Sequence, residues 1–575
     1  MDQSNKVSLE DAIELFIWAL EKPNDIEKKQ QLIAAFENDP QTVLDAVHAV
    51  AQENNLYPPQ YEYIVPEDAV PAWTNCIDEQ SCIPLEYRYP NSLNDLVAIV
   101  NEATTKKVPV RAIGSGHSFS DITSSQDAIL VDPHQDLSQG HQGLAEVFPV
   151  DASILHPNTD PANMIRAQCG ITVADLNKQL DARNLGLINM GAYDGQTISG
   201  ALSTGTHGSG AKYGPMADFL LSIVLVTETG KVYQIEPSAN PITDPAKFPG
   251  HLPEAPTVPV ELKQSDDWFR AAKVAMGCLG IIYSYTIRVQ PAFKLSEVRT
   301  MTNWETMKPL LSSSTWPPPI LNETDHFELL INPYAEGNKS HKCIQVKRTR
   351  EPGSTPSRGA RLTGIWKWLE ELGVKNSAAL VVLLNTLPGW FNRGAINSAL
   401  GFLKDADPPY VDVSHAVFTL GIENTMKAWA VELHFDAAED CVAGIDTVLA
   451  AFETLGKEKK WYVAGPIGVR FVKGSDAFLA PQAGRFTVTV ELDMLYGIKH
   501  DRDLLGKVKE IVCGSVGGDG GRSARVHWGL DWGFTTAEDV RRWYPDLGKW
   551  QGVYREVNQT GMFDNAFTKR LGLRE

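Results

Sequence analysis

The chain has 575 residues, of which 43% are apolar and 21% are charged, and its formal net charge is −19. This length is sufficient for two or three domains with large buried cores. The excess of acidic residues argues against nucleic acids and anionic membrane surfaces as partners, because both repel a strongly acidic protein.

The ends and apolar runs of the chain bear on its location. The start of the sequence lacks the basic and then apolar pattern of a signal peptide. The most apolar run, residues 378–387, is too short to span a bilayer. We therefore expect a cytoplasmic protein. Secretion stays as the alternative because three N-x-S/T sequons occur, at Asn322, Asn338 and Asn558.

The seven cysteines show no metal-ligand spacing, so the sequence predicts no metal site. Cys76 and Cys82 are compatible with a small loop disulfide or with two free thiols.

Residues 1–65 are expected to form a helical extension. Ser8-Leu-Glu-Asp11 has the form of a capping box, and apolar residues such as Ile13, Phe16 and Leu20 follow at helical spacing. The segment contains no chemical motif, so we expect it to serve in packing or in contacts between subunits.

Strands and helices alternate from Tyr87 onward, and the first glycine-rich stretch lies among them. Residues 108–113 are expected to form a buried strand that runs into the turn Gly114-Ser-Gly116 and then His117. Such a turn directs backbone N–H groups toward an anion such as a pyrophosphate. The alternative is an ordinary glycine turn with a surface histidine.

A second stretch, residues 196–210, has four glycines and six hydroxyl residues in fifteen positions, which is typical of a backbone that wraps around a polar ligand. Residues 276–287 contain a third glycine turn that leads into a strand, and residues 220–226 are expected to be a buried strand. None of these stretches is the G-x-G-x-x-G of a Rossmann site, which disfavours a nicotinamide cofactor.

Together the glycine-rich stretches resemble the flavin domain of the vanillyl-alcohol oxidase and p-cresol methylhydroxylase (PCMH) type flavoproteins, in particular the aldonolactone and alditol oxidases. The resemblance runs from about residue 70 to the end of the chain. It implies an α+β fold, with a two-lobed PCMH-type FAD-binding domain at 66–290, an α+β substrate cap at 291–510 and a segment at 511–575 that returns to the flavin domain. Residues 413–419 and 428–435 resemble strands of the cap.

The resemblance further implies FAD as the cofactor, bonded covalently through His117. The residues that match the flavin motifs of the family, or lie beside them, are Arg111, Ile113, Gly114, Ser115, Gly116, His117, Ser118, Gly191, Thr197, Ser199, Gly200, Ser203, Thr204, Gly205, Thr206, His207, Gly208, Gly280, Ile281, Ile282 and Asn565.

The expected active site departs from the pattern of the alditol oxidases. The position of their E-x-R pair is occupied here by Gly468-Val-Arg470, so the arginine is present and the glutamate is not. Other family residues are replaced as follows: a histidine and a threonine by Glu491 and Asp493, a serine by Ala192, and a lysine by Leu530. The candidate catalytic residues are Arg470, Glu491, Asp493 and His527. Glu491 and Asp493 are two apart on one strand face, so they form either a structural ion-pair cluster with Arg470 or a pair in which one raised pKa provides an acid or base. His527 is either a proton relay or a hydrogen-bonding partner of the flavin ring.

These features predict an FAD-dependent oxidase that removes a hydride from a C–H beside a hydroxyl of a sugar-derived or other polar small molecule. Molecular oxygen is the expected acceptor, with hydrogen peroxide as product. In the family, the Gly191 position lies near flavin C4a, and a dehydrogenase keeps alanine there; the alternative is that Gly191 serves a turn that needs positive φ.

Three rival functions remain: a dehydrogenase with a quinone or cytochrome acceptor, a specialised-metabolism oxidase with an altered pocket, and a flavin-holding protein without turnover. The expected partners are a small-molecule substrate and oxygen, with no nucleic acid and no membrane span. The oligomeric state stays open.

Overall fold

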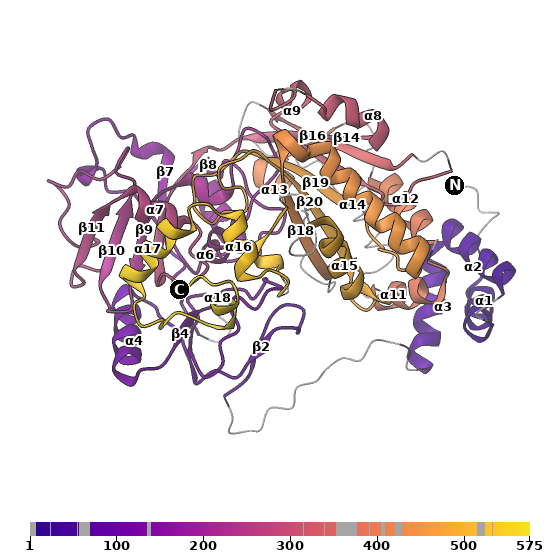
Figure 1. The fold of residues 1–575 in the computed structure, drawn as a ribbon, viewed down its shortest axis with the longest axis horizontal. Helices are drawn as coiled ribbons and strands as arrows, with labels where there is room; N and C mark the ends of the chain where they lie inside the picture. Colours follow the sequence, from indigo (N-terminus) through magenta and orange to yellow (C-terminus); the bar gives the residue numbers. More distant parts are fainter. Residues whose placement is uncertain are drawn as a thin grey trace.

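The computed structural model describes residues 7–22, 25–54, 56, 70–134, 140–313, 315–337, 340–351, 377–389, 391–403, 409–419, 428–513, 524–531 and 533–574. Figure 1 shows a lobe built from β4 to β12 at one side, a larger β-sheet lobe at the other, and three N-terminal helices beyond it. Helices and sheets occur in both lobes, so the predicted α+β class is confirmed.

The N-terminal helices form a small bundle against the sheet lobe. They are α1 (Leu9–Glu21), α2 (Ile26–Asn38) and α3 (Pro40–Glu53). Ser8 caps α1 as expected, because its hydroxyl accepts a hydrogen bond from the Asp11 N–H at 3.1 Å. Helix α3 packs on α11 (Ser377–Thr386), and Lys29 Nζ donates to the Thr386 carbonyl at 2.8 Å. The extension therefore adds to the core of the sheet lobe.

The lobe that carries the glycine-rich stretches, called the flavin-type lobe below, contains two sheets. A parallel three-stranded sheet has the order β3-β5-β4, and a six-stranded sheet has the order β11-β10-β9-β12-β7-β6. The predicted buried strand at residues 220–226 is β9 with the same bounds, and its side chains are almost all buried because sheet neighbours and helices cover both faces.

The strands of this lobe are β3 (Glu86–Arg88), β4 (Val110–Ala112), β5 (Ile129–Val131), β6 (Val147–Pro149), β7 (Met164–Gln168), β9 (Leu220–Val226), β10 (Val232–Glu236), β11 (Val260–Gln264) and β12 (Ile281–Arg288). Short pairs are β1 (Trp73–Thr74) with β2 (Ser81–Cys82), and β8 (Leu185–Gly186) with β13 (Gln290–Pro291). The helices are α4 (Leu93–Lys106), α5 (Val173–Asp181), α6 (Ile198–Ser203) and α7 (Asp266–Lys273).

The second lobe is built on an eight-stranded sheet, called the cap sheet below, with the order β17-β14-β16-β15-β19-β20-β18-β21. Every pairing in it is antiparallel. Its strands are β14 (Lys294–Asn303), β15 (His326–Ile331), β16 (Lys342–Glu351), β17 (Tyr410–Val413), β18 (Ala428–Asp436), β19 (Ile467–Val472), β20 (Thr487–Leu495) and β21 (Arg525–Val526). The helices around it include α8 (Trp304–Leu311), α9 (Pro319–Asn322), α12 (Phe391–Leu403), α13 (Ser414–Phe418), α14 (Ala437–Lys459) and α15 (Asp501–Cys513).

One predicted cap strand is wrong. Residues 428–435 do form β18, whereas residues 413–419 are mostly the helix α13. Val413 pairs with Lys294, the first residue of β14, and the Ser414 N–H donates to the Phe293 carbonyl at 3.0 Å, after which the chain leaves the edge of β14. It turns into a helix that buries Val417 and Phe418 instead.

The C-terminal segment connects the two lobes. β21 pairs with β18 at the edge of the cap sheet, and α16 (Ala537–Trp543), α17 (Leu547–Val557) and α18 (Ala566–Arg570) then lie on the flavin-type lobe (Figure 1). No disulfide joins Cys76 and Cys82. Within the described ranges, none of the helices combines the length and the apolar character needed to cross a bilayer.

Candidate active site

The main cavity has a volume of about 430 Å³ and is lined by both lobes. One wall is the glycine turn after β4 with the loops around residues 191–207, and the other comes from β18, β19, β20 and the turn at Trp528–Leu530. A smaller cavity of about 90 Å³ adjoins it and shares Gly114, Ser118, Thr123, Thr197, Gly200 and Thr204. The two cavities share part of their lining, and the end of the main cavity at the cap sheet is lined by the charged residues Glu432, Arg470, Glu491 and Asp493.

The glycine turn is shaped by close approach to α6. A Cβ at Gly114 would lie 2.3 Å from Thr197 Oγ1, and Gly116 has φ +67°, so neither position accepts a side chain without strain. Thr197 is itself fixed, because its hydroxyl caps α6 by accepting from the Gly200 N–H. The two glycine-rich stretches therefore lie against each other and form one continuous wall.

His117 follows this turn and lines the main cavity. Its ring stacks on Tyr193 with a centroid distance of 4.0 Å. Burial lowers the pKa of His117 to about 4, because a charged ring is poorly solvated there. The imidazole is consequently neutral at pH 7.

Arg111 is a buried cation at the wall of the smaller cavity. Its Nη1 donates to the carbonyls of Gly277 and Phe563 at 3.0 Å each, and Nη2 donates to those of Met276 (2.7 Å) and Ile122. Among the described residues no carboxylate pairs with it, and burial lowers its pKa. A buried cation that four carbonyls hold, with no carboxylate in direct contact among the described residues, favours an anion nearby.

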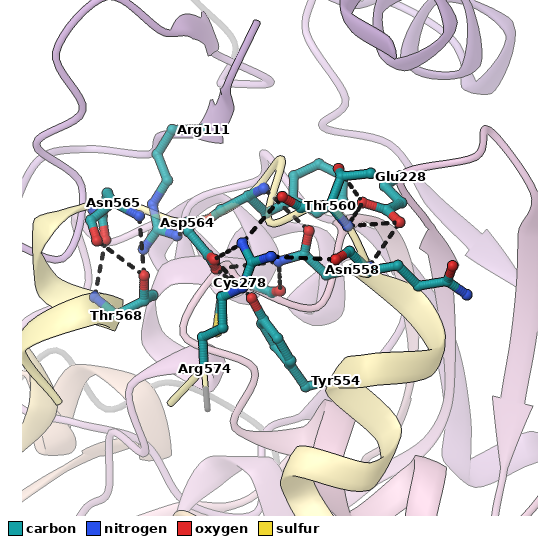
Figure 2. Close-up of polar contacts among 12 residues, drawn as sticks. Arg111, Glu228, Cys278, Tyr554, Asn558, Thr560, Asp564, Asn565, Thr568 and Arg574 are labelled. Atoms are coloured by element: carbon teal, nitrogen blue, oxygen red, sulfur yellow. Dashed lines mark hydrogen bonds and ion pairs between the residues drawn. The ribbon is translucent and has the colours of Figure 1, made fainter. Parts of the chain in front are cut away.

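The C-terminal segment supports this arginine through Phe563 and Asn565, and Figure 2 shows Arg111 beside Asn565. The Asn565 side chain donates to the carbonyls of Ile122 (3.0 Å) and Ser124 (3.1 Å), so it braces the loop that binds Arg111. Asn558 donates to the Cys278 carbonyl at 3.0 Å and braces the glycine turn on the other side. Asn565 is therefore placed behind the cavity wall.

Most residues predicted to bind the cofactor line one of the two cavities. Four do not, namely Gly205, Gly208, Gly280 and Asn565. The glycines among them meet other parts of the backbone or a neighbouring ring; for example, a Cβ at Gly280 would lie 2.4 Å from the Val226 carbonyl. Their role is to let the wall pack closely.

Gly191 lines the main cavity, and its backbone lies outside the positive-φ region. The turn interpretation of this glycine is therefore wrong. Space is the constraint, because an added Cβ would lie 3.0 Å from Thr206 Cγ2 and 3.6 Å from the His207 carbonyl.

The cap wall carries Arg470 on β19 between several carboxylates. Its Nε donates to Glu328 Oε1 at 2.9 Å, its Nη1 donates to Glu491, and Nη1 lies 3.9 Å from Glu432 Oε1. Burial alone would lower the pKa of Arg470, but these negative charges raise it well above its ordinary value. Arg470 is thus a fixed, permanent cation.

Asp493 is on the same face of β20 as Glu491, as predicted, and both line the cavity. Its side chain is open to the space within the cavity. Burial, and then the negative charge of Glu491, raise the pKa of Asp493 well above its ordinary value, although Arg470 opposes this. The two carboxylates thus differ in their partners, because Glu491 is paired with Arg470. Asp493 faces the cavity.

Sequence reasoning named His207 but missed its buried partners Glu432 and His434, with which it forms a cluster. His207 Nε2 lies 3.1 Å from Glu432 Oε1, and His434 Nε2 lies 3.2 Å from Glu432 Oε2. Strand alternation over the predicted strand at residues 428–435 places Ala430, Glu432 and His434 on one face, and this signal could have found them.

The pKa values of the three residues in this cluster shift in different directions. Burial alone would raise the pKa of Glu432, but His207 and His434 hold it well below its usual value. Burial alone would lower the pKa of His207, but Glu432 outweighs it and raises that pKa, whereas the pKa of His434 falls to about 4. One ligand atom from each of the three residues lies within 4.8 Å of the others, a spacing that could hold a metal ion. The Arg470 guanidinium beside Glu432 already supplies positive charge there.

His527 lines the same end of the cavity. Burial lowers its pKa to about 3, so the ring is neutral. Its Nδ1 accepts a hydrogen bond from the Gly529 N–H at 3.1 Å, which places the ring proton on Nε2. The ring is thus a hydrogen-bond donor through Nε2.

Comparison with known proteins gives two family matches. Residues 84–236 match an FAD binding domain, and residues 285–571 match the D-arabinono-1,4-lactone oxidase family. Similar relatives are L-gulonolactone oxidase of Bos taurus, 25% identical over 85% of this chain and 96% of its own, and L-gulono-1,4-lactone dehydrogenase of Mycobacterium tuberculosis, 25% identical over 87% and 99%.

Among solved structures, cholesterol oxidase from B. sterolicum has a similar fold, with a TM-score of 0.59, 13% identity and coverage of 89% of this chain and 99% of its own. A solvent-stable cholesterol oxidase aligns with a TM-score of 0.61, 14% identity and coverage of 88% and 100%.

Proposed function

Because the chain belongs to the aldonolactone oxidase branch of the PCMH-type FAD flavoproteins, we propose that it oxidises a neutral sugar lactone, or a closely related polyhydroxy compound, at a C–H beside a hydroxyl. The observation that supports this proposal is that two different walls face each other across one cavity. A glycine-rich wall with a buried cation suits FAD, and a wall with one fixed arginine and one open carboxylate suits a hydroxyl that loses a proton.

The chain's own residues fit FAD. The wall at Gly114 and Thr197 excludes side chains and leaves backbone groups to contact the cofactor, and Arg111 supplies positive charge for the pyrophosphate. Bound FAD supplies the acceptor for a hydride. A neutral imidazole ring carries the nitrogen lone pair that a covalent bond to the flavin requires, and we propose that bond for His117.

Residues of the cap wall take up the proton that the substrate hydroxyl loses. Asp493 accepts the hydroxyl proton of the substrate, and Arg470 stabilises the negative charge that develops on that oxygen. Glu491 keeps Arg470 oriented. The Nε2–H group of His527 is the donor that this ring offers to a ligand in the cavity. Three carboxylates and one arginine line this end of the cavity, so an anionic substrate is disfavoured.

The direct test is anaerobic flavin bleaching by purified protein. L-Gulono-1,4-lactone and D-arabinono-1,4-lactone are the first compounds to test, and the ring-opened aldonates are matched controls. We expect a lactone to bleach the flavin and its aldonate to bleach it far more slowly. Bleaching by the aldonates alone, or by none of a panel of lactones and polyols, would contradict the proposal.

Molecular oxygen is the proposed acceptor, with hydrogen peroxide as product, because Gly191 leaves the cavity open beside Thr206 and His207. The second candidate is a dehydrogenase, favoured by the relative of that name in Mycobacterium tuberculosis. Mixing reduced protein with aerated buffer, or with a quinone in the absence of oxygen, separates the two.

A further inference from the structure

Charged residues form a row across the cap sheet, on strands that lie next to one another. Glu297 on β14 is directly opposite Arg348 on β16, and Glu328 on β15 is directly opposite Arg470 on β19. The row ends at Glu491 on β20. Charges of opposite sign therefore alternate from strand to strand until they reach the cavity.

Glu328 lies at the centre of this row and outside the cavity lining. Its side chain is only 10% exposed. One oxygen accepts from Arg470 Nε at 2.9 Å, and the other accepts from Arg348 Nη1 at 3.3 Å. Arg348 is anchored in turn, because its Nε donates to Glu297 Oε2 at 2.7 Å.

We propose that Glu328 is a positioning residue that fixes the guanidinium of Arg470 toward the substrate; this inference rests on the proposed function. Glu328 binds Nε and Glu491 binds Nη1, so the plane of the guanidinium is held at two points. Among the described residues Nη2 has no protein acceptor, which makes it the nitrogen available to a substrate oxygen.

The charge of Glu328 also separates two cations. Arg348 and Arg470 both bind this one carboxylate, from opposite sides. Burial alone would raise the pKa of Glu328, but the two arginines lower it, so the carboxylate is ionised. Without its negative charge the arginines face each other in a buried setting, where unbalanced like charges are costly. Arg470 is the one with space to move, because it borders the cavity.

The test compares Glu328→Gln, Glu328→Asp and the control Glu254→Gln as FAD-loaded proteins. Glu254 forms an ion pair with Arg166 on the flavin-type lobe, away from both cavities, and its side chain is 19% exposed. Crystal structures of the three are the first readout. We expect the Arg470 guanidinium to leave its position in Glu328→Gln, and to keep it in Glu328→Asp and in the control. An unmoved Arg470 in Glu328→Gln would overturn the inference.

The second readout is the rate of anaerobic flavin reduction by the active lactone. A misplaced Arg470 should slow reduction by about 10- to 100-fold, with partial recovery in Glu328→Asp and no change in the control. In an Arg470→Met background, Glu328→Gln should add no further loss, because Glu328 acts through Arg470. An equal loss in both backgrounds would overturn the inference. If no compound bleaches the flavin, the proposed function fails, and the crystal structures still decide the role of Glu328.

Discussion

Gly191→Ala is the substitution that separates an oxidase from a dehydrogenase with the smallest change in the protein. The new Cβ lies 3.0 Å from Thr206 Cγ2, so the methyl group has to shift by a few tenths of an ångström. Overpacking of this kind costs about 1 kcal/mol. Because Gly191 lies outside the positive-φ region, alanine also gains about 0.4–1 kcal/mol by restricting the unfolded chain. The two terms nearly cancel, and the variant should fold normally.

The oxygen reaction should respond differently, because the added methyl group narrows the space beside Thr206 and His207. We expect reoxidation by oxygen to slow about tenfold or more, which corresponds to about 1.4 kcal/mol in activation free energy. Flavin reduction by substrate should change much less. The assay reduces each protein without oxygen, mixes it with aerated buffer, and follows flavin absorbance and peroxide.

Two further variants make this test specific. Gly191→Ala combined with Thr206→Ser removes the Cγ2 contact and with it the overpacking, whereas the added methyl group remains, so reoxidation should stay slow. Gly548→Ala is the matched control, because a Cβ there meets nothing within 4 Å. Unchanged reoxidation in Gly191→Ala would refute the steric reasoning. Slow reoxidation in the unaltered protein, together with rapid transfer to a quinone, would refute the oxidase proposal.

Three other predictions test the remaining parts of the site. The rate of flavin reduction should rise as the pH passes through the raised pKa of Asp493, because a base must be deprotonated to accept a proton. Asp493→Asn should remove this pH dependence and slow reduction by about 10²- to 10⁴-fold, and an unchanged pH profile in the variant would exclude Asp493 as the base. The pKa of Glu432 is lowered from 4.5, so its charge contributes stability that is present above pH 4.5 and lost as the pH falls. In thermal unfolding, Glu432→Gln should therefore destabilise the protein by about 3 kcal/mol near pH 7 and by progressively less below pH 4.5. A loss of stability that does not depend on pH would contradict the ionised state of Glu432. Acid-denatured protein should keep its flavin bound to the polypeptide, and His117→Ala should release it; flavin that washes out of the unaltered protein would rule out the covalent bond.

Features that depend on local sequence could be predicted. The cap at Ser8, the strand β9 and the glycine turn before His117 each follow from a few neighbouring residues, and the motifs also indicated the family. The domain boundaries and the assigned roles of the site residues stay predictions.

The partners of Arg470 could not be predicted in the same way. Glu328 reaches it only because β15 and β19 are neighbours, although more than a hundred residues separate them in the chain. The missing glutamate before Arg470 looked like a loss, whereas the structure supplies a carboxylate from the adjacent strand. Strand order in an antiparallel sheet is set by tertiary packing, and residue patterns within one strand carry no record of it.

The contact between Arg111 and the Phe563 carbonyl has a consequence for biosynthesis. The two residues are 452 positions apart. At typical translation rates of about 5–20 residues per second, the ribosome needs about 20–90 s to make the intervening chain. During this interval the nascent flavin lobe already contains Arg111, but the carbonyl of Phe563 and the bracing amide of Asn565 do not yet exist. Cofactor loading should therefore follow synthesis of this last stretch.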